Sequence, residues 1–279
     1  MRLSSSHSCV SKILLNKEQI MNILLNGITG HMGREVEKLC LDSYRGAKLV
    51  MGVDINATGS ENVPTYKSFS EIDSSESIDC IVDFSFHTAT PAMLDFAVEN
   101  GIPVIVATTG HTEDEIEAIK RAAFSVPVFF SANMSLGVAL LVELAKTAAL
   151  AMPDAEIEIV EKHHNRKLDA PSGTALMLAR EICEVRPSSY VNTGRSGQGK
   201  RTPEEIGIHA IRMGNIVGEH EVIVGTQNQT ITLKHEAHSR ALFAEGALAA
   251  AAFLIGCAPG LYDMKSIVSS TAKKDEVTV

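Results

Sequence analysis

The sequence has no tryptophan, and aromatic residues make up only 5 % of its 279 positions. Proteins that bind single-stranded nucleic acid stack bases on aromatic side chains, so this composition does not favour that class. Basic residues are also outnumbered, since 25 Lys and Arg face 34 Asp and Glu and give a formal net charge of −9. Such a chain has little positive charge to displace the counterions of a phosphate backbone, and we expect no nucleic acid partner.

Long apolar runs and paired cysteines are missing as well. The longest apolar run, residues 247–255, is too short to cross a bilayer, so we expect no membrane partner. The five cysteines are scattered without a C-x-x-C pair. This pattern predicts no zinc knuckle and fits a reducing compartment, and we expect a cytoplasmic protein. The remaining composition is that of a globular chain, and its length predicts about two domains.

Residues 1–20 differ from the rest of the chain. They are rich in serine and carry Arg2, Lys12 and Lys17 against one acid, Glu18. This composition fits a transit peptide, and it also fits a disordered extension that precedes Met21, where the first apolar strand begins. We expect a disordered extension, with a targeting segment as the alternative.

Residues 21–133 alternate between short apolar segments and amphipathic ones. Strands are expected over 22–26, 48–53, 79–84, 102–107 and 126–130, with helices over 35–41, 90–99 and 113–123. Apolar strands separated by helices are typical of a parallel sheet that is covered on both faces. The pattern predicts an α/β fold with a Rossmann-like, doubly wound parallel sheet.

The pattern changes after residue 133. An apolar helix is expected over 136–152, and strands are expected over 156–161, 209–213, 221–225 and 230–235, the last two joined as a hairpin at 227–228. The segment 193–202 is basic and glycine-rich and is expected to be mobile. We predict a second α+β domain with a mixed sheet over 134–241. An apolar helix over 241–255 is expected to return the chain to the first domain, which then consists of 21–133 and 242–279.

A glycine-rich turn follows the first strand and opens a helix, with the sequence Gly27-Ile28-Thr29-Gly30-His31-Met32-Gly33. Glycines in this context let a pyrophosphate approach the backbone N–H groups at the helix N-terminus. Asp54 ends the second strand, where a carboxylate can accept hydrogen bonds from an adenosine ribose. A turn aspartate or a helix cap is the alternative for Asp54. Together these features predict a nicotinamide-dinucleotide site.

The densest group of reactive side chains lies in 158–175. His163, His164, Arg166 and Lys167 precede a probable helix start that Ser172 or Asp169 can cap. In an acidic chain this is a local cationic site for a small carboxylate or dicarboxylate, with a histidine that can transfer a proton. A solvated basic loop with a capping motif is the alternative.

The run Glu158-x-x-Glu161-x-His163-x-x-x-Lys167-x-Asp169-x-Pro171-Ser172-Gly173-Thr174-Ala175 resembles the signature of the 4-hydroxy-tetrahydrodipicolinate reductases, long called dihydrodipicolinate reductases. The resemblance extends from Met21 to the C-terminus. It includes the glycine turn, Asn133, Ile216-Val217-Gly218-Glu219-His220 and Ser239-Arg240.

The resemblance implies an oxidoreductase that uses NADH or NADPH to reduce 4-hydroxy-tetrahydrodipicolinate to tetrahydrodipicolinate with loss of water, in lysine biosynthesis through diaminopimelate. His163 and Lys167 are then the catalytic proton carriers, and His164, Gly173 and Thr174 hold the substrate. Cofactor contacts fall on Gly27, Ile28, Thr29, Gly30, His31, Met32, Asp54, Ala107, Thr108, Thr109, Ser131, Ala132, Asn133 and Met134. Members of the family are usually homotetramers joined through the sheet of the second domain.

Two departures from the family pattern bear on the cofactor. His31 and Ile55 stand where the family often has basic residues that neutralise a 2′-phosphate, so NADH is favoured weakly over NADPH. Two other functions remain open, a dinucleotide-sensing regulatory protein and another nicotinamide oxidoreductase that acts on a small carboxylate. A zinc site at His235 and His238 is disfavoured, because the two side chains point to opposite faces of a strand.

Overall fold

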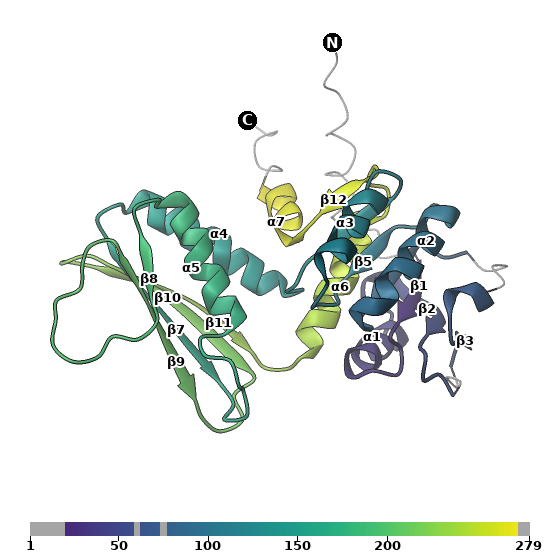
Figure 1. The fold of residues 1–279 in the computed structure, drawn as a ribbon, viewed down its shortest axis with the longest axis horizontal. Coiled ribbons are helices and arrows are strands. Elements are labelled where there is room, and N and C mark those ends of the chain that lie inside the picture. Colours follow the sequence, from purple (N-terminus) through teal and green to yellow (C-terminus); the bar gives the residue numbers. More distant parts are fainter. Residues whose placement is uncertain (1–19, 59–61, 73–76, 273–279) are drawn as a thin grey trace, which may run out of the picture. The chain divides into compact units, whose positions relative to one another are not determined.

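The computed structural model describes residues 20–58, 62–72 and 77–272 (Figure 1). The chain divides into two compact units. Among the described residues, the first unit holds the chain up to Ser135 and again from Ala241, and the second unit holds Leu136–Arg240. The extension predicted over residues 1–20 lies outside the described residues, apart from Ile20.

The described part of the first unit contains a seven-stranded sheet in the order β12-β6-β5-β4-β1-β2-β3, with every neighbouring pair parallel. Its strands are β1 (Met21–Asn26), β2 (Ala47–Val53), β3 (Thr65–Tyr66), β4 (Cys80–Asp83), β5 (Val104–Val106), β6 (Pro127–Phe130) and β12 (Gly260–Tyr262). Ile23, Leu24 and Leu25 are fully buried, as expected of a parallel sheet that is covered on both faces. The predicted Rossmann-like sheet is confirmed.

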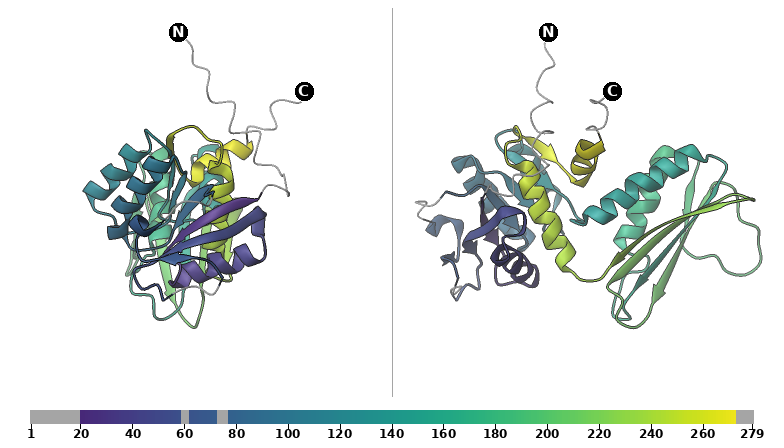
Figure 2. Two further views of the ribbon diagram at one scale, coloured as in Figure 1. Left: turned by 90° about the vertical axis from the view of Figure 1, so that its right-hand side faces the viewer. Right: turned by 180° about the vertical axis from the view of Figure 1, so that it is seen from behind.

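Helices cover both faces of this sheet. They are α1 (His31–Leu41), α2 (Thr90–Asn100), α3 (Glu113–Ala122), α6 (Ala241–Leu254) and α7 (Met264–Ala272), together with the short turns η2 (Tyr44–Gly46), η3 (Phe69–Glu71) and η4 (His87–Ala89). Helix α1 packs against α6, and α2 packs against α3 on the other face (Figure 2). The ends of the strands therefore stay open at one edge, where ligands of such sheets bind.

Helix α6 carries the chain back into the first unit. Most of its residues are buried, in keeping with an apolar composition on all sides. At Gly246 a Cβ atom would lie 1.7 Å from the main-chain oxygen of Met134, so only glycine permits this approach. The two segments that enter and leave the second unit are thus packed together at Met134 and Gly246.

The second unit contains, among the described residues, a five-stranded sheet in the order β11-β10-β7-β9-β8. Its elements are β7 (Glu156–His163), β8 (Tyr190–Asn192), β9 (Glu205–Arg212), β10 (Gly218–Gly225), β11 (Thr230–Ala237), α4 (Leu136–Ala151) and α5 (Gly173–Val185). Strand β7 is parallel to β9 and antiparallel to β10, so the predicted mixed sheet is confirmed. The helices α4 and α5 lie on one face of the sheet (Figure 1), and Leu141, Ile159 and Leu178 belong to the core beneath them.

All four strands predicted for the second sheet are longer than predicted. Strand β10 already begins at Gly218, and β11 continues to Ala237. Strand β7 continues to His163, and β9 already begins at Glu205. The sequence prediction was wrong here because Glu205, Gly207 and the charged end of β7 are residues that strands usually avoid. Pairing between β7 and β9 outweighs these preferences. It places His163 opposite Arg212 at the end of a strand rather than in a loop.

Candidate active site

The end of β7 in the second unit carries a carboxylate and a histidine in hydrogen-bond contact. Glu161 and His163 are two residues apart, so both side chains point to the face of the sheet that the helices cover. The Nδ1 atom of His163 lies 2.6 Å from Oε2 of Glu161. An ionised carboxylate only accepts hydrogen bonds, so the proton sits on Nδ1 and Nε2 is the atom free to exchange protons.

Glu161 is completely buried and is held by several donors. Arg212 donates to both carboxylate oxygens from its Nη1 and Nη2 atoms, at 2.8 and 2.6 Å. The backbone N–H of Ser172 donates to Oε1 at 3.0 Å. Burial raises the pKa of Glu161, but the hydrogen bonds from Arg212 and His163 together outweigh this effect. The net result is a lowered pKa, so the carboxylate is charged at neutral pH.

Ser172 and His220 form the next layer around His163. The Ser172 hydroxyl caps α5 by accepting from the N–H of Ala175 at 3.2 Å, as one of the two predicted caps requires. The Ser172 hydroxyl oxygen also lies 3.0 Å from Nε2 of His220. The rings of His220 and His163 pack edge to face, with 5.2 Å between their centroids. Burial, together with the nearby His163, lowers the pKa of His220 to about 4. His220 is therefore neutral and accepts from the serine hydroxyl.

The loop that follows β7 gathers positive charge. Lys167 forms an ion pair with Asp169, with 2.8 Å between Nζ and Oδ1. Burial and the neighbouring Arg166 and Arg240 lower the pKa of His164, whose buried Nδ1 atom has no hydrogen-bond partner within the described chain. These contacts place His163, His164 and Lys167 in one electrostatic neighbourhood, next to the start of α5 where Gly173 and Thr174 lie.

Three residues of this site were not predicted from the sequence to have a role. Arg212 holds both oxygens of Glu161 and belongs to no recognised motif. Glu161 and His220 lie within the family motifs, but the motifs alone assign them no role. Strand register is what assembles them, since Arg212 on β9 and His220 on β10 align with His163 and Glu161 of β7. No local motif in the sequence encodes that alignment.

In the first unit, the glycine turn joins β1 to α1. Gly27 has a φ of +86°, and a Cβ atom there would lie 2.6 Å from the main-chain oxygen of Phe84. At Gly33 a Cβ atom would lie 2.2 Å from the oxygen of Gly27, so the helix packs tightly on the turn. No side chain caps the helix at Gly30. An uncapped helix N-terminus beside a glycine turn suits a phosphate group.

A pocket of about 500 Å³ lies at this edge of the first sheet. Gly27, Thr29, Gly30 and Asp54 line it, while the other predicted cofactor residues do not. Ile28 is buried and packs against Gly52 instead. His31 lies at the start of α1, and Met32 is the next residue of that helix. The pocket and its uncapped helix fit the phosphate and adenosine half of a dinucleotide.

The remaining predicted cofactor residues follow β5 and β6 at the same edge. Thr108 is buried, and its hydroxyl lies beside the buried carboxyl group of Asp83. Ser131 donates to the main-chain oxygen of Asn133 at 2.8 Å, which closes a local turn. The side chain of Met134 is 2 % exposed, so it belongs to the core. Ala107, Thr109 and Ala132 lie in the same two loops.

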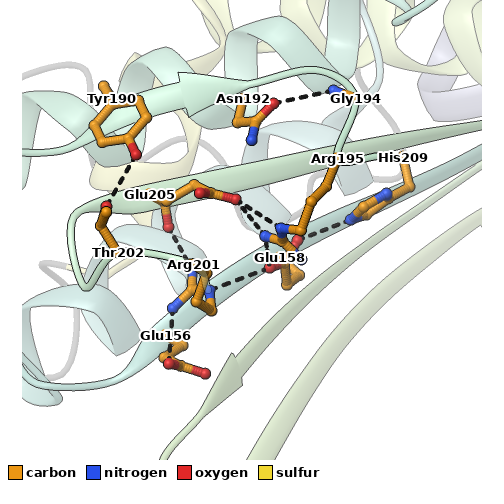
Figure 3. Close-up of polar contacts among 10 residues, drawn as sticks. All are labelled: Glu156, Glu158, Tyr190, Asn192, Gly194, Arg195, Arg201, Thr202, Glu205 and His209. Atoms are coloured by element: carbon orange, nitrogen blue, oxygen red, sulfur yellow. Dashed lines mark hydrogen bonds and ion pairs between the residues drawn. The ribbon is translucent and has the colours of Figure 1, made fainter. Parts of the chain in front are cut away.

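A second cluster of charged side chains lies near the start of β7, on its other face (Figure 3). The carboxylate of Glu158 contacts Nη2 of Arg195 and Nε2 of His209, each at 2.8 Å. Nη1 of Arg201 forms an ion pair with Oε1 of Glu156 at 3.1 Å. Arg195 also pairs with Glu205. The basic segment 193–202, which we expected to be mobile, is therefore attached to the sheet by both of its arginines. We call these five side chains, Glu156, Glu158, Arg195, Arg201 and His209, the outer cluster.

Within the described residues, no group of His, Cys, Asp or Glu side chains has the arrangement of a metal site. His235 lies on β11, whereas His238 lies beyond the end of that strand at Ala237. No helix among these residues combines the length and apolar character needed to span a bilayer.

Family models match both units of the chain. The N-terminal model of dihydrodipicolinate reductase matches residues 21–134, and the C-terminal model matches residues 137–268. The chain belongs to the dihydrodipicolinate reductase family. A 4-hydroxy-tetrahydrodipicolinate reductase from Caldanaerobacter subterraneus subsp. tengcongensis is 45 % identical over 251 residues, which cover 89 % of this chain and 98 % of the relative. A reductase of the same name from Clostridium novyi is 40 % identical over 250 residues, 89 % of this chain and 98 % of the relative.

Solved structures show the same fold. A dipicolinate-bound dihydrodipicolinate reductase from Paenisporosarcina sp. TG-14 aligns with a TM-score of 0.75 at 24 % identity, covering 88 % of this chain and 98 % of that one. A myo-inositol dehydrogenase from Corynebacterium glutamicum aligns with a TM-score of 0.55 at 17 % identity, covering 91 % of this chain and 94 % of that one. The two-unit architecture of dihydrodipicolinate reductases is thus shared with other dehydrogenases.

Proposed function

We infer that this protein reduces 4-hydroxy-tetrahydrodipicolinate to tetrahydrodipicolinate with a nicotinamide dinucleotide, in lysine biosynthesis through diaminopimelate. In balance, the substrate gains a hydride and a proton and loses water. The observation that carries this inference is the match of both units to dihydrodipicolinate reductases, together with the Glu161–His163 pair beside a cationic loop. A sensor has no need of such a proton-transfer pair, which disfavours the regulatory alternative.

His163 and Lys167 are the proposed catalytic residues. Glu161 keeps the proton on Nδ1 of His163 and stabilises the ring when it becomes charged, so Nε2 can exchange a proton with the substrate. Gly218 leaves room for this, since a Cβ atom there would lie 3.1 Å from Nε2. Lys167 is the second proton donor and contacts a substrate carboxylate, in exchange for its ion pair with Asp169.

Substrate binding is proposed for the start of α5. Gly173 and Thr174 form the first turn of α5 there, at the positive end of the helix dipole. His164 is proposed to contact the substrate, and Arg166 and Arg240 add positive charge near it. A dicarboxylate matches this charge, as does the dipicolinate in the related structure.

For the cofactor we propose NADH or NADPH, with NADH favoured weakly. The reduced nicotinamide ring supplies the hydride, and the chain contributes the residues that hold the dinucleotide. Those proposed are the glycine turn from Gly27 to Met32, Asp54, and the loops 107–109 and 131–134. The uncapped α1 N-terminus and the pocket beside it support the phosphate and adenosine end.

We also propose a cytoplasmic homotetramer joined through the second sheet. In the described second unit, helices cover one face of this sheet and leave the other open (Figure 1). Ile211 on β9 points to that open face and is 37 % exposed. Light scattering on the purified chain tests the assembly, and a monomer at working concentration would contradict it.

The activity is tested by the oxidation of NADH or NADPH with the cyclic imine generated in situ from pyruvate and aspartate semialdehyde. We expect rapid substrate-dependent oxidation, and a loss of roughly 100-fold or more in Lys167→Ala with dinucleotide binding unchanged. Lys120→Ala is the matched control, because Lys120 is an exposed lysine of α3 that also forms an ion pair, with Glu117 at 2.6 Å. If neither dinucleotide is oxidised in a substrate-dependent way, the inference is wrong.

A further inference from the structure

Lys67 lines the pocket of the first unit together with Gly27, Thr29 and Gly30 of the glycine turn. Strand β3 pairs with β2 so that Tyr66 lies beside Val53, and the N–H of Asp54 donates to the oxygen of Tyr66 at 2.9 Å. Lys67 is the next residue, and it therefore leaves the sheet next to Asp54, about one strand spacing of roughly 5 Å away. The carboxylate predicted to hold the adenosine ribose thus has an ammonium group on the neighbouring strand.

Asp54 is already engaged in several hydrogen bonds. Its Oδ2 atom accepts from the N–H and the hydroxyl of Thr29, at 3.1 and 2.6 Å, and its Oδ1 atom accepts from the N–H of Asn56 at 2.9 Å. A carboxylate has about four acceptor positions, so about one remains for a ribose hydroxyl. Asp54 therefore also acts as the turn aspartate that the sequence left as an alternative. Its discrimination against a 2′-phosphate is weaker than that of a carboxylate with two free oxygens.

The side chain of Lys67 places a positive charge at the pocket. Its side chain is exposed, and its ammonium group has no ion pair among the described residues. The Oε2 atom of Glu71 accepts a hydrogen bond from the main-chain N–H of Lys67 at 3.1 Å. Ile55, which follows Asp54, is 81 % exposed and brings no charge. Lys67 is thus the cation that the pocket presents beside Asp54.

We propose that Lys67 binds the 2′-phosphate of NADPH and so allows this chain to use NADPH as well as NADH. The proposal rests on the nicotinamide-dinucleotide site of the proposed function and adds a specificity-determining residue to it. A 2′-phosphate is carried by the ribose oxygen that Asp54 would otherwise bind, so a neighbouring ammonium offsets the repulsion between the carboxylate and the phosphate.

The test is a calorimetric titration of the full chain with NADPH and with NADH, without the imine substrate. We expect Lys67→Ala to weaken NADPH binding about 10-fold or more, as the loss of a charge-assisted hydrogen bond does, and to change NADH binding less than about 2-fold. The fragments 2′,5′-ADP and 5′-AMP should show the same contrast. Added salt should weaken NADPH binding more in the wild type than in the variant.

Lys48→Ala is the matched control, because Lys48 lies near the start of β2, at the opposite edge of the sheet. It removes the same charge and should leave both dissociation constants unchanged. Equal effects of Lys67→Ala on both dinucleotides, or no effect on either, would overturn the proposal. The titration measures binding and no turnover. If the protein bound dinucleotides but did not reduce the imine, the proposed function would be wrong, and the effect of Lys67→Ala on NADPH binding could still be determined.

Discussion

Strand β7 carries two clusters built from the same three residue types, one on each face. In the outer cluster, Glu158 pairs with Arg195 and His209 (Figure 3). On the covered face, Glu161 pairs with Arg212 and His163. We call Glu161, His163, Ser172, Arg212 and His220 the inner cluster. Hydrogen bonds from arginine and histidine outweigh burial in both places, so the pKa values of Glu158 and Glu161 are both lowered.

Burial separates the two clusters. The side chain of Glu161 is 0 % exposed and that of His163 is 11 % exposed, whereas Glu158 and His209 are 23 % and 41 % exposed. In a single chain, water screens the outer charges, whereas the inner charges are shielded from water and their geometry is held by packing. The same residue types therefore attach a loop on one face and form the proposed proton-transfer site on the other.

The largest expected difference concerns the two histidines. His163→Ala should lower kcat by roughly 100- to 10 000-fold, because it removes the proposed general acid and base. His209→Ala should change kcat less than about 3-fold, since its ring pairs only with Glu158 in the outer cluster. Steady-state oxidation of reduced nicotinamide checks both, with calorimetry to show that the dinucleotide still binds. Similar losses in the two variants would abolish the distinction between the clusters.

The two arginines should differ in their effect on stability. Arg212→Ala leaves the fully buried Glu161 without its main partner, so the free energy of unfolding should fall by about 3 kcal/mol. Arg195→Ala should lower it less, because Arg195 and its partner Glu158 are reached by solvent and only its second partner, Glu205, is buried. Urea unfolding followed by circular dichroism measures both changes. An equal loss in both variants would mean that burial does not separate the clusters.

His220 should make the inner cluster sensitive to acid. Its pKa is lowered to about 4 in the folded chain, against about 6.5 when unfolded, so the unfolded state binds the proton first as the pH falls. The contribution of neutral His220 to the free energy of unfolding is complete above about pH 6.5. It should be lost as the pH falls toward 4, which lowers the free energy of unfolding by up to about 3 kcal/mol.

His220→Gln should flatten this part of the stability curve. Urea unfolding at a series of pH values makes the comparison, and a slope that persists in His220→Gln would show that another group causes it.

The smallest effect is expected in the outer cluster. Glu158→Gln should cost about 1 kcal/mol or less, and the difference from the wild type should shrink at high salt. Urea unfolding at low and high ionic strength measures it. A loss above about 2 kcal/mol that persists in salt would instead indicate that assembly through the open face buries the cluster.

The sequence predicted the parallel sheet of the first unit because its apolar strands and glycine turn are local signals. The mixed sheet of the second unit was also predicted, and the Ser172 cap of α5 was one of two alternatives. Lys67 and Arg212 were missed for different reasons. Strand β3 has two residues, so its segment does not resemble a strand until β2 aligns it. Arg212 lies in the predicted strand 209–213, but only the register with β7 places it opposite His163.

The amino-acid sequence alone determined the two-unit architecture, the family and the segments that hold the candidate residues, because periodicity, turns and motifs act over a few neighbouring positions. Only the tertiary structure decided how those residues are used. It placed Arg212 opposite His163, bound both oxygens of Asp54, and separated Glu158 from Glu161 by burial. Register and burial arise from contacts between distant segments, and they set the strength of each charge.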